Sequence, residues 1–111
     1  MQKLFSAILM ITSLACSAWA MGDDSVIIDV RTIEEWNAGH LATAQHLQLE
    51  LVAESVGNLV ADKDQEVYVY CRSGNRSGQA KIIMESLGYT NVTNAGGLGD
   101  ASELLAVEVV K

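Results

Sequence analysis

The chain has 111 residues, half of them hydrophobic, with a net charge of −7 and two cysteines. This length suits one domain with one core, and the acidic charge excludes nucleic acid as an expected partner.

Residues 1–20 have the pattern of a signal peptide. Lys3 precedes an apolar run over residues 4–15, and Ala18-Trp19-Ala20 supplies the small residues of a cleavage site. We therefore expect cleavage after Ala20, which leaves residues 21–111 as one periplasmic domain.

Two other interpretations of residues 1–20, a transmembrane helix and a lipid anchor, have less support. The apolar run is shorter than the roughly 20 residues that cross a bilayer. Lipid attachment at Cys16 is disfavoured because Ser13 stands where a leucine usually precedes a lipidated cysteine. We expect no stable membrane association of the mature domain.

Cys71 is the one cysteine of the mature segment. It has no partner for an internal disulfide and no cysteine cluster for zinc, so we predict no metal and no cofactor. Its thiol is either buried and inert or free and reactive.

The mature segment begins with a predicted strand and a short helix. Residues 26–30 form a largely β-branched run that is typical of a buried central strand. Thr32 and Glu35 have the spacing of a capping box, which predicts a helix that ends at residues 37–39. A brief strand flanked by turns is expected within residues 39–47.

A second helix is predicted over residues 50–59, followed by a polar turn at residues 62–65. The apolar residues at helical spacing, which we expect to face the core, are Leu51, Val52, Val56 and Leu59.

The next strand leads to the residues that carry the chemistry. Residues 67–70 are β-branched or aromatic, and the strand is expected to end at Cys71. A helix is predicted from Ser77 onward, with Gly88 as its C-terminal cap. Its expected apolar face consists of Ala80, Ile83, Met84 and Leu87.

Beyond this helix we predict a strand at residues 89–94 and a helix at residues 102–106. The glycines at residues 95–99 between them indicate positive φ or a close approach of two backbones. Because strands alternate with helices, the expected fold class is α/β, with a small parallel sheet of about four strands flanked by helices.

The loop after Cys71 has the features that stabilise a thiolate. Backbone N–H groups of residues 72–76 converge at a helix N-terminus, whose dipole favours negative charge, and Arg72 and Arg76 add positive charge. Such surroundings lower a cysteine pKa from about 8.5 into the range of roughly 3.5–7.5. The residues therefore predict a nucleophilic cysteine.

Motifs along most of the mature segment resemble a single-domain rhodanese. They are Ile28-Asp29-Val30-Arg31, Glu35-Trp36, Gly39-His40-Leu41, Ala44, Cys71-Arg72-Ser73-Gly74-Asn75-Arg76-Ser77, Leu87-Gly88-Tyr89 and Gly96-Gly97. The resemblance is greatest to the exported, periplasmic type of thiosulfate sulfurtransferase. It implies a rhodanese-like domain whose active-site loop lies between a strand and a helix N-terminus.

The resemblance also implies a reaction and its residues. Cys71 would take the sulfane sulfur of thiosulfate as a persulfide and pass it to cyanide or a thiol. The expected partners are thus small molecules, and we expect a monomer. Substrate binding would fall to Arg72, Ser73, Gly74, Asn75 and Arg76, through their backbone N–H groups and the two arginine side chains.

Other polar residues receive a structural interpretation. Asp29 and Arg31 are expected to form an internal ion pair, and Trp36 to be a core residue. His40 is interpreted as a turn residue with a satisfied side chain, and the role of His46 is left open, since a thiolate needs no general base.

Other function classes are left open by the residues. Cysteine phosphatases and arsenate reductases have a similar loop with five residues between cysteine and arginine, whereas four separate Cys71 from Arg76. A non-catalytic rhodanese-like binding module commonly lacks the cysteine, which is present here. A thiol-disulfide oxidoreductase would need a second cysteine.

Overall fold

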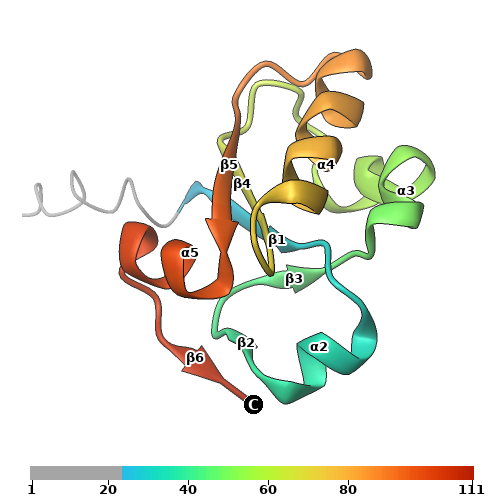
Figure 1. Cartoon of the computed structure of the whole chain (residues 1–111). Helices are drawn as coiled ribbons and strands as arrows, with labels where there is room; N and C mark the ends of the chain where they lie inside the picture. The colour runs from blue at the N-terminus through green and yellow to red at the C-terminus, as the bar shows by residue number, and fades with distance from the viewer. Residues whose placement is uncertain (1–23) are drawn as a thin grey trace, which may run out of the picture.

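The computed structural model describes residues 24–111 (Figure 1). The expected signal peptide and its cleavage site lie outside the described residues. Within residues 24–111, no helix is long and apolar enough to cross a membrane. The elements in chain order are β1 (Val26–Asp29), α2 (Ile33–Ala38), β2 (His40–Leu41), β3 (Gln45–His46), the 3-10 helix η3 (Leu49–Leu51), α3 (Val52–Leu59), β4 (Val67–Cys71), α4 (Asn75–Ser86), β5 (Val92–Gly97), α5 (Leu98–Leu105) and β6 (Val109–Val110).

Cys71 lies at the end of a strand in a parallel sheet of four strands. The strand order is β3-β1-β4-β5, so β1 and β4 are central. Both consist mainly of β-branched and aromatic residues, as expected for strands that are covered on both faces. The predicted α/β fold with its small parallel sheet is confirmed.

Helices cover both faces of this sheet (Figure 1). α3 and α4 pack on one face, and α5 packs against β4 and β5 on the other. Alternate residues of β4 therefore enter different cores. Val69 and Cys71 lie in the core under α3 and α4, whereas Tyr68 and Tyr70 lie in the core under α5.

The predicted capping box of α2 is present. Thr32 Oγ1 accepts a hydrogen bond from the Glu35 N–H at 3.2 Å, and Glu35 Oε1 accepts one from the Thr32 N–H at 3.0 Å. This arrangement fixes the start of α2 and turns the Glu35 side chain toward the rest of the site.

Two of the four residues predicted for the apolar face of α3 are buried, and the prediction is wrong for the other two. Val52 and Val56 are buried, but Leu51 and Leu59 are 43% and 37% exposed. Leu51 belongs to η3 and precedes the helix, so it does not share the face of α3. At the other end Val60, in an extended conformation, turns into the core in place of Leu59.

The start and end of α4 also differ from the prediction. The helix begins at Asn75, two residues before Ser77, and ends before Leu87, which is 39% exposed as the C-cap. Gly88 has a φ of 102°, in agreement with its predicted role in ending the helix. The predicted core residues Ala80 and Met84 are buried.

The C-terminal segment departs most from the prediction. α5 begins at Leu98 rather than at residue 102, because the Asp100 carboxylate accepts a hydrogen bond from the Gly97 N–H at 3.1 Å and caps the first turn. Ala106, with a φ of 55°, ends the helix. β6 then pairs antiparallel with β2, a pairing between distant segments that no local pattern indicates.

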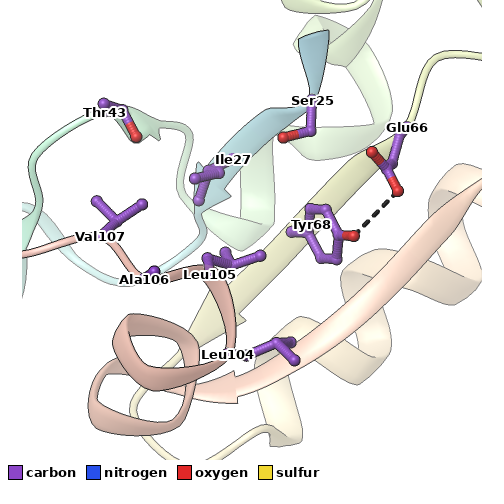
Figure 2. A pocket seen from close by; sticks show the side chains of 9 residues that line it. All are labelled: Ser25, Ile27, Thr43, Glu66, Tyr68, Leu104, Leu105, Ala106 and Val107. Atoms are coloured by element: carbon purple, nitrogen blue, oxygen red, sulfur yellow. Dashed lines mark hydrogen bonds between the residues drawn. The ribbon is translucent and has the colours of Figure 1, made fainter. Parts of the chain in front are cut away.

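Figure 2 shows the residues that line a cavity of about 460 Å³. This cavity lies at the opposite end of the sheet from Cys71. Ser25 and Glu66 line it and directly precede β1 and β4, whereas Cys71 is the last residue of β4. Tyr68, whose hydroxyl donates a hydrogen bond to Glu66 at 3.0 Å, and Leu104 of α5 line it as well. This cavity is therefore separate from the Cys71 site.

Candidate active site

Cys71 lies where the sequence predicts it, between the end of β4 and the start of α4. Residues 72–74 connect the two elements. Gly74 is the N-cap of α4 and has a φ of 101°, a left-handed conformation that glycine adopts at little cost. Its N–H points back to Cys71 and donates a hydrogen bond to Sγ at 2.9 Å.

Hydrogen bonds make the Cys71 thiol more acidic than usual. Sγ is buried and forms no disulfide, and the Ser77 hydroxyl lies 3.4 Å from it. Burial raises the pKa of Cys71, but hydrogen bonds from Ser77, Ser73 and Gly74 outweigh burial and lower the pKa from 9.0 to about 7. The loop and the first turn of α4 provide this stabilisation, and the neighbouring arginines contribute less.

The pKa of Cys71 gives a test of this environment. At pH 6 a thiol with a pKa of about 7 holds about a hundredfold more thiolate than one with a pKa of 9.0. A thiolate of lower pKa is less nucleophilic, so we expect iodoacetamide to alkylate Cys71 about tenfold faster than a peptide cysteine at pH 6. The rate should level off above pH 7, and a rate that keeps rising to pH 9 would contradict the assignment.

Arg76 is held by an acidic side chain of α2. Its Nη1 and Nη2 atoms donate to Glu35 Oε1 at 2.8 Å and Oε2 at 3.0 Å. The hydrogen bond from Arg76 is the main reason why the pKa of Glu35 falls to about 2. The capping residue of α2 therefore also anchors the first turn of α4.

Arg72 differs from Arg76, because it is exposed and forms no ion pair with a residue of the described range 24–111. It lines a cavity of about 300 Å³ beside the loop. The other residues that line this cavity are Arg31, Glu35, Ala38, Leu98 and Gly99. Ser73 and Asn75 are exposed on the same loop.

The glycine-rich end of β5 supports the loop from the side. A Cβ at Gly97 would lie 2.3 Å from the Arg72 carbonyl oxygen, so only glycine permits this approach. Gly96 has a φ of 85°. The predicted close approach and positive φ are both present, although β5 spans residues 92–97 rather than 89–94.

Asp29 and Arg31 form the predicted internal ion pair. Arg31 Nη2 and Asp29 Oδ2 are 2.7 Å apart, and the two side chains are 6% and 0% exposed. The Arg31 backbone N–H also donates to Asp29 Oδ1 at 2.9 Å, and Nη2 donates to the Gly39 carbonyl oxygen at 2.6 Å. The pair therefore ties the end of β1 to the turn after α2.

The two histidines flank Trp36 rather than Cys71. The rings of His40 and Trp36 stack with their centroids 3.5 Å apart, and the His46 centroid is 5.1 Å from that of Trp36. His40 Nδ1 contacts the Trp36 carbonyl oxygen at 2.9 Å, which agrees with the predicted satisfied side chain, although His40 lies in β2 rather than a turn. His46 Nε2 contacts the Arg31 carbonyl oxygen at 2.7 Å.

Two residues near Sγ are absent from the site predicted by sequence. Ser77 is fully buried and touches Sγ from the first turn of α4, a position that its spacing from Cys71 could have indicated. Asn94 of β5 contacts both Ser77 and Gly74. No local pattern indicates Asn94, because its partners lie 17 and 20 residues away.

A family model described as Rhodanese-like domain matches residues 15–99, a range that includes Cys71 and its loop. The chain belongs to the rhodanese-like family. The resemblance of its motifs to a rhodanese is therefore confirmed.

Named relatives of this rhodanese-like chain are similar over most of their length. Thiosulfate sulfurtransferase PspE of Escherichia coli (strain K12) is 47% identical over 73 residues, or 66% of this chain and 70% of PspE. Thiosulfate sulfurtransferase GlpE of Pseudomonas entomophila (strain L48) is 33% identical over 75 residues, or 68% of this chain and 67% of GlpE. A solved structure of a rhodanese with anions from E. coli is 42% identical and has a TM-score of 0.72. The match covers 78% of this chain and 98% of the chain in that structure.

Proposed function

We propose that this protein is a thiosulfate sulfurtransferase that carries sulfur as a persulfide of Cys71. The observation that carries the proposal is the free, buried Sγ, to which Gly74 and Ser77 donate hydrogen bonds and whose pKa they help lower to about 7. Membership of the rhodanese-like family and the names of PspE and GlpE support the choice of substrate.

The reaction has two half-reactions. The Cys71 thiolate attacks the outer sulfur of thiosulfate, the new S–S bond forms, and sulfite leaves with the electron pair of the broken S–S bond. Cyanide or a thiolate then attacks the outer sulfur of the persulfide, and the Cys71 thiolate leaves. Sulfur moves between nucleophiles in both steps, so atoms and electrons balance in each.

Several groups of the loop together bind the negative charge of the substrate, and each has its own part in this binding. We assign it to the backbone N–H groups of residues 72–76, since the first N–H groups of a helix have no intrahelical acceptor. The Arg72 side chain binds the substrate anion, because it is exposed and unpaired within residues 24–111. Arg76 contributes its backbone, since Glu35 holds its guanidinium group.

The two arginines should therefore respond differently to alanine. Arg72→Ala is expected to raise the KM for thiosulfate about fivefold to tenfold with little change in kcat, because it removes binding that both ground and transition states share. Arg76→Ala is expected to lower the free energy of unfolding by about 1 kcal/mol, as should Glu35→Gln. Steady-state kinetics and urea unfolding measure the two effects, and a larger KM change for Arg76→Ala would contradict the assignment.

A donor and acceptor panel on purified residues 21–111 tests the function itself. Thiosulfate with cyanide should yield thiocyanate and sulfite, whereas p-nitrophenyl phosphate and arsenate should not be turned over. Without thiocyanate, phosphate release would support a cysteine phosphatase, and arsenite formation with a thiol as reductant would support an arsenate reductase. A folded protein that turns over no substrate would support the non-catalytic binding module, so each of these results would overturn the proposal.

We also propose that the chain is exported, cleaved after Ala20 and active as a periplasmic monomer free of the membrane. The support is the leader pattern of residues 1–20. Intact mass of the protein recovered from the periplasm should correspond to a chain that starts at Met21. An acylated chain that starts at Cys16 would contradict this, and a dimer in analytical ultracentrifugation would contradict the monomer.

A further inference from the structure

We propose that Asn94 is a positioning residue for Cys71: its amide fixes the active-site loop to β5 and competes with Sγ for the single hydroxyl proton of Ser77. The inference rests on the proposed role of Cys71 as the nucleophile. It concerns a residue that acts on Sγ through Ser77 and Gly74.

The amide of Asn94 has its orientation fixed by two backbone groups. Oδ1 accepts a hydrogen bond from the Gly96 N–H at 3.0 Å, and Nδ2 donates one to the Gly74 carbonyl oxygen at 3.0 Å. A flipped amide would place a donor against an N–H and an acceptor against a carbonyl. Asn94 therefore ties Gly74, which donates to Sγ, to the glycine-rich end of β5.

The Ser77 hydroxyl lies between two acceptors. It is 2.7 Å from Asn94 Oδ1 and 3.4 Å from Cys71 Sγ, and Ser77 is fully buried, so no solvent acceptor competes. A hydroxyl has one proton to donate. With this proton directed to Asn94, the lone pairs of Ser77 Oγ face Sγ and suit a protonated thiol.

Ionisation of Cys71 favours the other arrangement. A thiolate attracts the Ser77 proton, because hydrogen bonds to charged acceptors are stronger than neutral ones. Asn94 Oδ1 is not left unpaired when the proton turns, since it keeps the Gly96 N–H. The network thus has two satisfied states, and the strength of the Asn94 acceptor sets the balance between them.

The charged groups of the loop and of the elements beside it form none of the hydrogen bonds described for Asn94. They are Arg72 in the loop, Arg76 paired with Glu35 of α2, Asp29 paired with Arg31 at the end of β1, and Asp100 at the start of α5. A change at Asn94 leaves all of them in place, so its effect on the thiol is transmitted through Ser77 and Gly74.

Asn94→Asp tests the competition, because aspartate has nearly the same shape and is a stronger acceptor; it also removes the hydrogen bond that Nδ2 donates to the Gly74 carbonyl oxygen. We expect iodoacetamide to alkylate Cys71 about tenfold more slowly at pH 6 in this variant. Thr93→Asp is the control, since it adds the same charge at the neighbouring residue of β5, which is exposed as Asn94 is and forms none of the hydrogen bonds described for Ser77. Thr93→Asp should react like the wild type, and equal slowing in both variants would overturn the proposal.

The Ser77→Ala background shows whether Ser77 transmits the effect. Asn94→Asp should slow alkylation clearly less than about tenfold in Ser77→Ala, because no hydroxyl remains to redirect and only the lost hydrogen bond to Gly74 contributes. A full tenfold effect in this background would mean that the aspartate acts on Sγ directly or through Gly74, and would overturn the proposed competition for the Ser77 proton.

A measurement on the wild-type protein does not depend on a variant at Asn94 or Ser77. In NMR spectra, the Asn94 side-chain NH₂ signals should shift with the same midpoint as the Cβ signal of Cys71, and Cys71→Ser should remove this transition. Signals of Asn94 that stay constant through the titration would overturn the proposal. None of these experiments uses thiosulfate, so a protein that fails to transfer sulfur could still show the coupling, and the two failures are distinguishable.

Discussion

Replacement of Cys71 by serine is expected to lower thiocyanate formation from thiosulfate and cyanide by at least about a thousandfold, to background. A serine hydroxyl does not ionise in this loop, because its pKa lies far above that of a thiol. It can still accept the hydrogen bonds that Gly74 and Ser77 donate to Sγ. The variant should therefore be inactive and folded.

Thermal unfolding of both proteins at pH 6 provides the control for this variant. The folded pKa of Cys71 is about 7 and its ordinary value is 9.0, so the thiolate stabilises the fold only as the pH rises above 7. At pH 6 the wild type and Cys71→Ser should unfold at similar temperatures. Sulfur transfer by the folded serine variant at more than a few per cent of the wild-type rate would contradict the proposed nucleophile.

The largest loss of stability is expected from Asp29→Ala. This change leaves the Arg31 guanidinium buried without its carboxylate, with the Gly39 carbonyl oxygen as its remaining acceptor among the hydrogen bonds described. Breaking a buried pair in this way costs about 3–5 kcal/mol. Because small domains are stable by roughly 5–15 kcal/mol, urea unfolding should show a midpoint far below that of the wild type.

Two other variants separate the effect of burial from the effect of charge pairing on the free energy of unfolding. Glu85→Ala breaks the exposed pair of Lys81 and Glu85 on α4 and should cost less than about 1 kcal/mol. Asp29→Leu combined with Arg31→Met removes both buried charges and should cost less than Asp29→Ala alone. If Asp29→Ala costs no more than Glu85→Ala, the ion pair does not hold β1 to the turn after α2.

The parts of the fold that the sequence predicts are those set by local patterns. The β-branched runs before Val30 and Cys71 become the central strands, and the Thr32 capping box starts α2. The pairing of β6 with β2 depends on contacts between residues about 70 apart, and such pairing leaves no local signal. The start of α5 depends on Asp100, which the weak periodicity of residues 98–105 does not reveal.

The candidate site also has a part that local sequence predicts and a part that depends on contacts between distant segments. Cys71, its loop and the buried pair of Asp29 and Arg31 follow from neighbouring residues and from the resemblance to a rhodanese. The pairing of Arg76 with Glu35 joins residues 41 apart, and the contacts of Asn94 likewise depend on how β5 lies beside the loop. Sequence therefore indicates the proposed nucleophile, whereas the groups that hold its surroundings become visible only in the folded chain.

The most direct test of the proposed function is the intact mass of mature protein after incubation with thiosulfate alone. We predict that the mass rises by one sulfur atom, that cyanide then removes this sulfur as thiocyanate, and that Cys71→Ser shows neither change. A wild-type protein that never gains the sulfur, or a serine variant that does, would contradict a persulfide on Cys71.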